Sequence, residues 1–223
     1  MHLWDDTKGY LQLPYKKYAY VKDRNGQHIS LYGERLKRAT SFDKDDPTLH
    51  ESDIPPMTRF LVDQYTDSDE SSVGHRVMFF DIEVEVTEGF PDVQKAYNPI
   101  TSIALYDCIA EKYFTYCFDP QKRIESYEKG EEVVEFYETE YEMLNKFFQK
   151  YLEIRPTIIS GWNSEFFDIP YLYNRAVRIL GPELANLLSP ISQVIYSEYK
   201  KKHTIAGVSS LDYLQLYRQF TFT

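Results

Sequence analysis

The sequence predicts an α/β protein, in which a mixed β-sheet is flanked by helices and preceded by a small β-rich N-terminal module. The chain has 223 residues, of which 43% are hydrophobic, and this is enough to bury a core. From residue 76 onward, apolar strand-like runs alternate with segments whose apolar residues have helical spacing. Residues 1–75 are polar and irregular by comparison. We therefore expect two domains, residues 1–75 and 76–223.

The first domain is expected to contain a β-hairpin. Residues 15–21 alternate as a strand does, Asp23-Arg24-Asn25-Gly26 has the composition of a hairpin turn, and residues 28–32 return. Pro55 and Pro56 can open a short helix. The acidic and serine-rich residues 67–72 predict a solvated linker, with the domain boundary near Gly74.

The second domain is expected to alternate strands and helices. Residues 77–84 form a near-continuous apolar run, which is typical of a strand covered on both faces. A candidate protruding hairpin spans residues 193–205 and carries Lys200, Lys201 and Lys202 near its tip. The other predicted elements are strands at 100–108, 113–118 and 157–160 and helices at 140–151, 167–180 and from 211 to the end of the chain.

Composition limits the functions that fit. The formal net charge of −10 counts against a free-standing nucleic-acid binder, because affinity for phosphates comes mainly from Lys and Arg. Metal ions or a basic partner could bridge an acidic site to phosphate. The two cysteines are Cys108 and Cys117, and the chain shows neither a secretory signal nor a long apolar stretch. We expect a reduced cytoplasmic protein that does not enter a membrane.

Two carboxylates lie close together in the apolar run. Asp81 and Glu83 stand at positions i and i+2, so on a strand they point to one face, roughly 6.6 Å apart. Two oxygens at this spacing can meet one divalent ion. In a strand covered on both faces an unpaired carboxylate would cost several kcal/mol, so either a buried Arg or a metal must compensate it. Glu85 lies about 13 Å from Asp81 and is expected to be a surface charge.

A third carboxylate, Asp168, stands in the string Gly161–Leu172, at the entry to an amphipathic helix. An Asp in the first turn of a helix is favoured by the dipole and by capping, so alone it has a structural explanation. It can, however, face the same strand edge as Asp81 and Glu83. Three acidic groups that converge on a hard metal ion indicate phosphodiester hydrolysis.

These strings resemble two motifs of one enzyme family. Residues 80–84 with Gly89-Phe90-Pro91, and residues 161–175, are similar to the first and second exonuclease motifs of the 3′→5′ proofreading domain of family B DNA polymerases. They are most similar to the polymerases of large tailed bacteriophages, and the resemblance covers most of residues 15–223. It implies a ribonuclease H-like sheet and two Mg²⁺ or Mn²⁺ ions about 3.5 to 4 Å apart.

The resemblance also implies the ligands of the two ions. Asp81 would be shared by both ions, Glu83 would hold the tighter one, and Asp168 would hold the second, partly through water. One ion would activate the attacking water and the other would stabilise the leaving 3′ oxygen.

Further residues would contact the DNA. By the same resemblance Asn163 orients the scissile nucleotide, and Phe90 wedges against the terminal bases unless it is a core residue before Pro91. The hairpin lysines Lys200, Lys201 and Lys202 would help to part primer from template; alternatively they are solubilising edge charges.

The sequence departs from the family pattern in one respect that matters for activity. The third motif, a Tyr followed four residues later by Asp, is absent, since Tyr213 is followed by Tyr217. We expect these 223 residues to lack the polymerase domain as well. We therefore expect the chain to comprise the N-terminal region and a partial exonuclease domain of such a polymerase, cut either naturally or artificially. We expect it to have weak or no activity on single-stranded DNA 3′ ends.

Two alternatives stay open. The chain could be the non-catalytic half of a split polymerase that binds a second polypeptide, or a stand-alone nuclease completed by another acid such as Asp212. A sliding clamp would be a further partner of a complete polymerase, in the host cytoplasm if the protein is viral.

Overall fold

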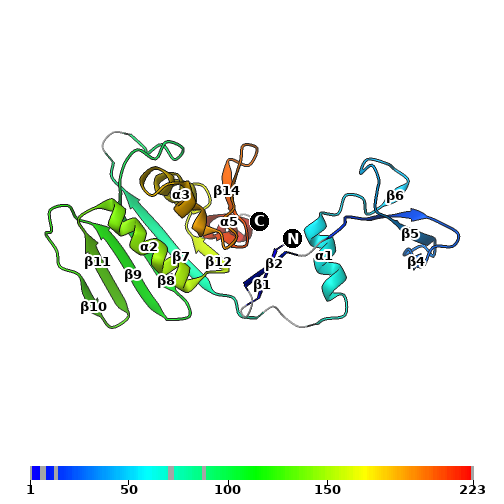
Figure 1. The fold of residues 1–223 in the computed structure, drawn as a ribbon, viewed down its shortest axis with the longest axis horizontal. Helices are drawn as coiled ribbons and strands as arrows, with labels where there is room; N and C mark the ends of the chain where they lie inside the picture. The colour runs from blue at the N-terminus through cyan, green and yellow to red at the C-terminus, as the bar shows by residue number, and fades with distance from the viewer. Residues whose placement is uncertain (1, 6–8, 13–14, 70–72, 87–88, 222–223) are drawn as a thin grey trace. The chain divides into compact units, whose positions relative to one another are not determined.

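The computed structural model describes residues 2–5, 9–12, 15–69, 73–86 and 89–221. The chain divides into two compact units, Met1–Ser71 and Ser72–Thr223 (Figure 1), and each is described by itself.

In its described residues, the first unit contains two small sheets and one helix. Strands β1 (His2–Asp5) and β2 (Gly9–Gln12) form an antiparallel pair. A four-stranded sheet has the order β4-β5-β3-β6. Its strands are β3 (Ala19–Lys22), β4 (His28–Ile29), β5 (Arg35–Ala39) and β6 (Leu49–His50). The predicted helix after the two prolines is confirmed as α1 (Pro56–Tyr65).

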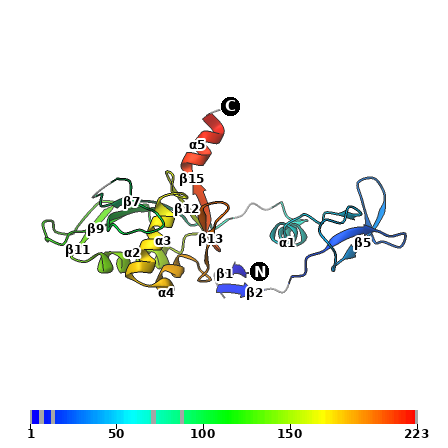
Figure 2. The same cartoon turned by 90° about the horizontal axis from the view of Figure 1, so that it is seen from above.

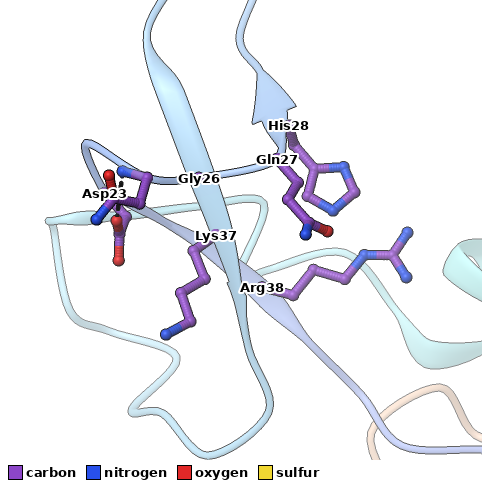
Figure 3. A pocket seen from close by; sticks show the side chains of 7 residues that line it. Asp23, Gly26, Gln27, His28, Lys37 and Arg38 are labelled. Carbon is purple, nitrogen blue, oxygen red and sulfur yellow. Dashed lines mark hydrogen bonds between the residues drawn. The ribbon is translucent and has the colours of Figure 1, made fainter.

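The predicted hairpin of the first unit is wrong. The turn itself forms, since the Gly26 N–H donates to the Asp23 carbonyl at 2.9 Å. However, β3 and β4 each pair with β5, which lies between them. A Cβ on Gly26 would lie 2.3 Å from the Leu36 carbonyl oxygen. The chain therefore crosses close over β5 at this glycine instead of folding back along β3 (Figure 3).

The second unit is built on a seven-stranded mixed sheet with the order β10-β11-β9-β8-β7-β12-β15. The predicted α/β class is thus confirmed. Strands β7, β8 and β9 are antiparallel neighbours, and β12 runs parallel to both β7 and β15. The strands are β7 (Val77–Val84), β8 (Ile100–Asp107), β9 (Lys112–Phe118), β10 (Tyr127–Lys129), β11 (Glu132–Tyr137), β12 (Ile158–Gly161) and β15 (Ser209–Asp212).

Helices cover one face of this sheet (Figures 1 and 2). They are α2 (Glu140–Ile154), α3 (Asp168–Ile179) and the short α4 (Pro182–Ala185), followed by the 3₁₀ turn η1 (Asn186–Leu188). The Thr139 side chain caps α2 by accepting from the Glu142 N–H. Arg155 ends α2 in the left-handed region, just before Pro156.

The opposite face of the sheet is open among the described residues. Along β7, Met78, Phe80 and Ile82 are buried in the core under the helices, whereas the residues between them are exposed. The predicted bounds of this strand are confirmed, but the expectation that both its faces are covered is wrong. An apolar run alone does not show how many faces of its strand are covered, and here the second face carries the two carboxylates.

The predicted protruding hairpin is confirmed as β13 (Val194–Ser197) and β14 (Lys202–Ile205). After β15, helix α5 (Tyr213–Thr221) projects from the unit (Figure 2), and none of its described side chains is buried. Within the described ranges, we find no helix with the length and apolarity needed to span a bilayer.

Candidate active site at the edge of strand β7

Asp81 and Glu83 lie side by side on the open face of the sheet. Both are exposed, and their partners on β8 are Ala104 and Ser102. They share one face of the strand, as their spacing predicts. Because this face is solvated, neither carboxylate needs a buried counter-charge, and the argument from burial cost does not apply to them.

The edge of β7 next to these residues is closed by the segment after β12. Strand β12 pairs with β7 only as far as Phe79. Gly161 then approaches so closely that a Cβ there would lie 2.6 Å from the Phe80 carbonyl oxygen. Next, the Ile82 N–H donates to Oδ1 of Asp168 at 3.1 Å. The prediction that Asp168 reaches the edge of this strand is therefore confirmed.

Asp168 is a buried acid in an acidic environment. The residue is 3% exposed. Burial raises the pKa of its carboxyl group to about 7; the Ile82 N–H opposes this change, and the negative charges of Asp81 and Asp212 add to it. A cation at this position would favour the ionised form of Asp168, and oxygen ligands of this kind suit Mg²⁺ or Mn²⁺.

The carboxylates do not form a closed ligand set. In the part of the chain that the structure describes, no group of three or more His, Cys, Asp and Glu side chains is placed to hold a metal ion. Asp168 and Asp81 are close enough for their charges to interact, and Glu83 shares the face of Asp81. The donor chemistry thus fits a divalent ion, while the assignment of all three as ligands stays a prediction.

Asn163 begins the tight turn that leads into α3. It has a left-handed backbone with φ of 60°, a conformation in which Asn is enriched. Its carbonyl accepts from the N–H groups of Phe166 and Phe167, each at 3.1 Å. These bonds give Asn163 a structural role in the turn, and its predicted contact with the scissile nucleotide stays a prediction.

Phe90 is not a core residue. It is 81% exposed, and its ring centroid lies 5.3 Å from that of Phe167, just before Asp168. The alternative of a core Phe before Pro91 is therefore wrong. The exposed ring is compatible with stacking on a base, and its wedging role stays a prediction.

The three hairpin lysines differ in their surroundings. Lys200 is exposed, and Lys201 Nζ lies 3.0 Å from Glu198 Oε2 within the hairpin. Lys202 is the first residue of β14 and makes an ion pair with Glu165, Nζ to Oε2 at 2.7 Å. Lys202 is thus engaged at the turn before α3, and only Lys200 and Lys201 lie at the tip.

Asp212 has a role that the sequence did not reveal. It is 3% exposed, and its carboxylate accepts from backbone N–H groups of the turn before α3. In the sequence it lies in the segment predicted to be helical from residue 211, and its partners lie 47 and 49 residues away.

A hollow of about 350 Å³ lies beside Asp81 on the open face. Aromatic side chains surround it, namely Phe79, Tyr106, Tyr113 and Trp162. Another hollow, of about 600 Å³, lies in the first unit. Its basic residues Lys37 and Arg38 leave β5 on opposite sides and do not converge (Figure 3).

Comparison with known proteins decides the family. Residues 61–223 match the family model described as DNA polymerase family B, exonuclease domain. The chain belongs to DNA polymerase family B.

Two curated family B relatives are phage enzymes. The chain is 35% identical to the DNA-directed DNA polymerase of Escherichia phage RB69 over 177 residues, which are 66% of this chain and 19% of that protein. It is 35% identical to the DNA-directed DNA polymerase of Enterobacteria phage T4 over 171 residues, or 63% of this chain and 19% of that protein. The DNA polymerase of Pyrococcus glycovorans is 30% identical over 131 residues, which are 59% of this chain and 15% of that protein. The family B chain thus spans about a fifth of the length of its phage relatives.

Proposed function

We propose that this chain is the N-terminal and exonuclease portion of a family B DNA polymerase that removes deoxynucleotides from single-stranded 3′ ends during DNA replication. The observation that carries the proposal is Asp168. It is buried at the edge of β7, close to the charge of Asp81, in a segment that matches the exonuclease-domain family.

Asp81, Glu83 and Asp168 would hold the divalent ions, Mg²⁺ or Mn²⁺. Bound there, the ions would supply a water of lowered pKa and a Lewis acid for the leaving 3′ oxygen. The chain's own residues orient the reaction. The Ile82 N–H fixes one Asp168 oxygen, while the open face leaves Asp81 and Glu83 accessible to a DNA end.

The exposed ring of Phe90 offers a base-stacking surface at this end. Phe167, which its ring contacts, immediately precedes Asp168. A terminal base stacked on Phe90 would therefore lie near the carboxylates. The turn residue Asn163 would complete the contacts to the scissile nucleotide.

We expect the chain alone to be weakly active or inactive. Among the described residues the carboxylates do not close around an ion, and an incomplete ligand set leaves the attacking water poorly oriented. Release of nucleotides from 3′-labelled single-stranded DNA with Mn²⁺ measures this. Rapid turnover that Asp81→Ala abolishes would contradict the expectation of weak activity while supporting the site.

Mn²⁺ binding tests the site without relying on turnover. We expect Asp81→Asn to weaken binding at least tenfold, because a charged oxygen ligand becomes neutral. Glu85→Gln is the matched control, since it neutralises an exposed carboxylate near the end of the same strand. Titration calorimetry or electron paramagnetic resonance measures the affinity, and equal Mn²⁺ affinity in the two variants would argue against the assigned site.

A second candidate function is that of a non-catalytic half that binds a second polypeptide. The open face and α5 favour it, because Phe79, Trp162 and Tyr213 are each between 44% and 55% exposed. A partner that covers these rings could also bring a further carboxylate. Nuclease activity that appears on mixing with a polymerase-bearing chain would support this candidate, whereas failure of the two chains to co-elute would count against it.

A further inference from the structure

The carboxylate of Asp212 accepts from three backbone N–H groups. Its Oδ1 accepts from the N–H groups of Asn163 at 3.1 Å and Leu214 at 2.9 Å, and its Oδ2 accepts from the N–H of Glu165 at 3.0 Å. The residue is 3% exposed. Hydrogen bonds to an ionised acceptor are stronger than those between neutral groups, so this carboxylate ties the end of β15 to the turn before α3.

Backbone hydrogen bonds connect the turn at Asn163 to the start of α3. The Asn163 carbonyl accepts from Phe166 and Phe167, and the Ser164 carbonyl accepts from the Ile169 N–H at 2.9 Å. A displacement of the backbone at Asn163 is therefore passed on to the first turn of α3. That first turn carries Asp168.

The side chain of Glu165 provides a second attachment. It forms an ion pair with Lys202 at 2.7 Å, and both side chains are largely shielded, at 27% exposed for Lys202 and 14% for Glu165. The backbone of Glu165 is thus held from β15 and its side chain from β14. Two strands that come later in the sequence, β14 and β15, therefore hold the turn.

We propose that Asp212 is a positioning residue, which holds the turn at residues 163–165 so that Asp168 lies against the edge of β7. Asp212 already uses both of its oxygens on backbone N–H groups, so the proposal gives it no ligand role. The consequence for nuclease activity rests on the proposed function above, but the positioning itself does not.

Hydrogen exchange by NMR tests the proposal, because the position of Asp168 has its own reporter. The Ile82 N–H is bonded to Asp168 and is far in sequence from Asp212. In Asp212→Ala we expect the amides of Asn163, Glu165 and Leu214 to exchange at least tenfold faster, and the amide of Ile82 as well. Faster exchange in the turn with an unchanged Ile82 would overturn the proposal, since Asp212 would then be only a local cap.

Two further variants make the result decisive. Ser160→Ala removes a different bond between β12 and β15, that from Ser160 Oγ to the Leu211 carbonyl at 2.7 Å, and should leave Ile82 unchanged. Asp212→Asn keeps one acceptor oxygen and serves if the alanine variant does not fold; we expect at least threefold faster exchange at Glu165 and Ile82. Equal effects of Ser160→Ala and Asp212→Asn on Ile82 would also overturn the proposal. These experiments measure amide exchange and not nuclease activity, so the proposed function and the positioning role of Asp212 can fail independently of each other.

Discussion

Asp168 is a buried acid whose pKa the fold raises to about 7, from an ordinary value of 3.8. Between these two pH values the folded chain keeps the proton that the unfolded chain has released. The contribution of Asp168 to the free energy of unfolding of the metal-free protein therefore falls as the pH rises from about 4 to about 7, and stays lower above that. The same carboxylate that fits a divalent ion destabilises the fold without one.

At the residue scale we expect Asp168→Asn to stabilise the metal-free protein at pH 8. The amide cannot ionise, so the cost of a buried charge is removed, and this is worth on the order of 2 to 4 kcal/mol for a shift of this size. Thermal unfolding in EDTA should show a midpoint several degrees higher than wild type at pH 8. Glu85→Gln is the exposed control. A midpoint at pH 8 that matches wild type would show that the raised pKa is not a property of this site.

Among larger elements, the hairpin of β13 and β14 contains a buried histidine. His203 is 7% exposed, and the ring centroids of Tyr173 and Tyr196 each lie 5.0 Å from its own. Its Nδ1 has no hydrogen-bond partner within the described ranges. Burial lowers the pKa of this imidazole below its ordinary 6.5, so the folded hairpin holds the neutral form.

Acid should therefore loosen the hairpin. As the pH falls below about 6.5, His203 takes up a proton in the unfolded chain but stays neutral in the folded one. Its contribution to the free energy of unfolding is therefore lost between pH 6.5 and the lower pKa that His203 has in the folded chain. Amide exchange in β14 should speed up between pH 7 and pH 5, after correction for the intrinsic pH dependence. His203→Phe should remove this acid sensitivity, and His75→Gln, at an exposed histidine, should retain it. A retained acid response in His203→Phe would assign it to another group.

At the scale of the whole molecule, the two compact units have separate interiors. The buried residues of the main apolar cluster run in the sequence from Met78 to Ile205, so they all belong to the second unit. The family match nevertheless begins at residue 61, inside α1. The region matched by the family model and the compact unit thus have different starting points.

We expect residues 72–223 to fold without Met1–Ser71, because their core is built from their own side chains. Amide protection of β7, β8 and α2 should be the same in the isolated unit and in the full chain, as measured by hydrogen exchange. The reciprocal fragment 1–71 serves as the comparison. Loss of protection in the isolated second unit would show that the first unit contributes to its stability.

The elements that depend on local pattern could be predicted from the residues alone. The apolar run at 77–84 predicted β7, the helical spacing after residue 140 predicted α2, and the i, i+2 spacing placed Asp81 and Glu83 on one face. The sequence also carried the two motifs by which the family is recognised. These features depend on residues that are close together in the chain.

Three features depend on contacts between residues that are distant in the chain. They are the open face of β7, the strand pairing of the first unit, and the bonds that hold the turn before α3. An apolar run has the same composition whether one or both of its faces are covered. The Asp23–Gly26 turn forms without pairing β3 to β4, because β5 lies between them. The hydrogen bonds of Asp212 go to backbone N–H groups, which every residue except proline carries. A bond of this kind between residues 47 or 49 positions apart therefore cannot be predicted from the residue types alone.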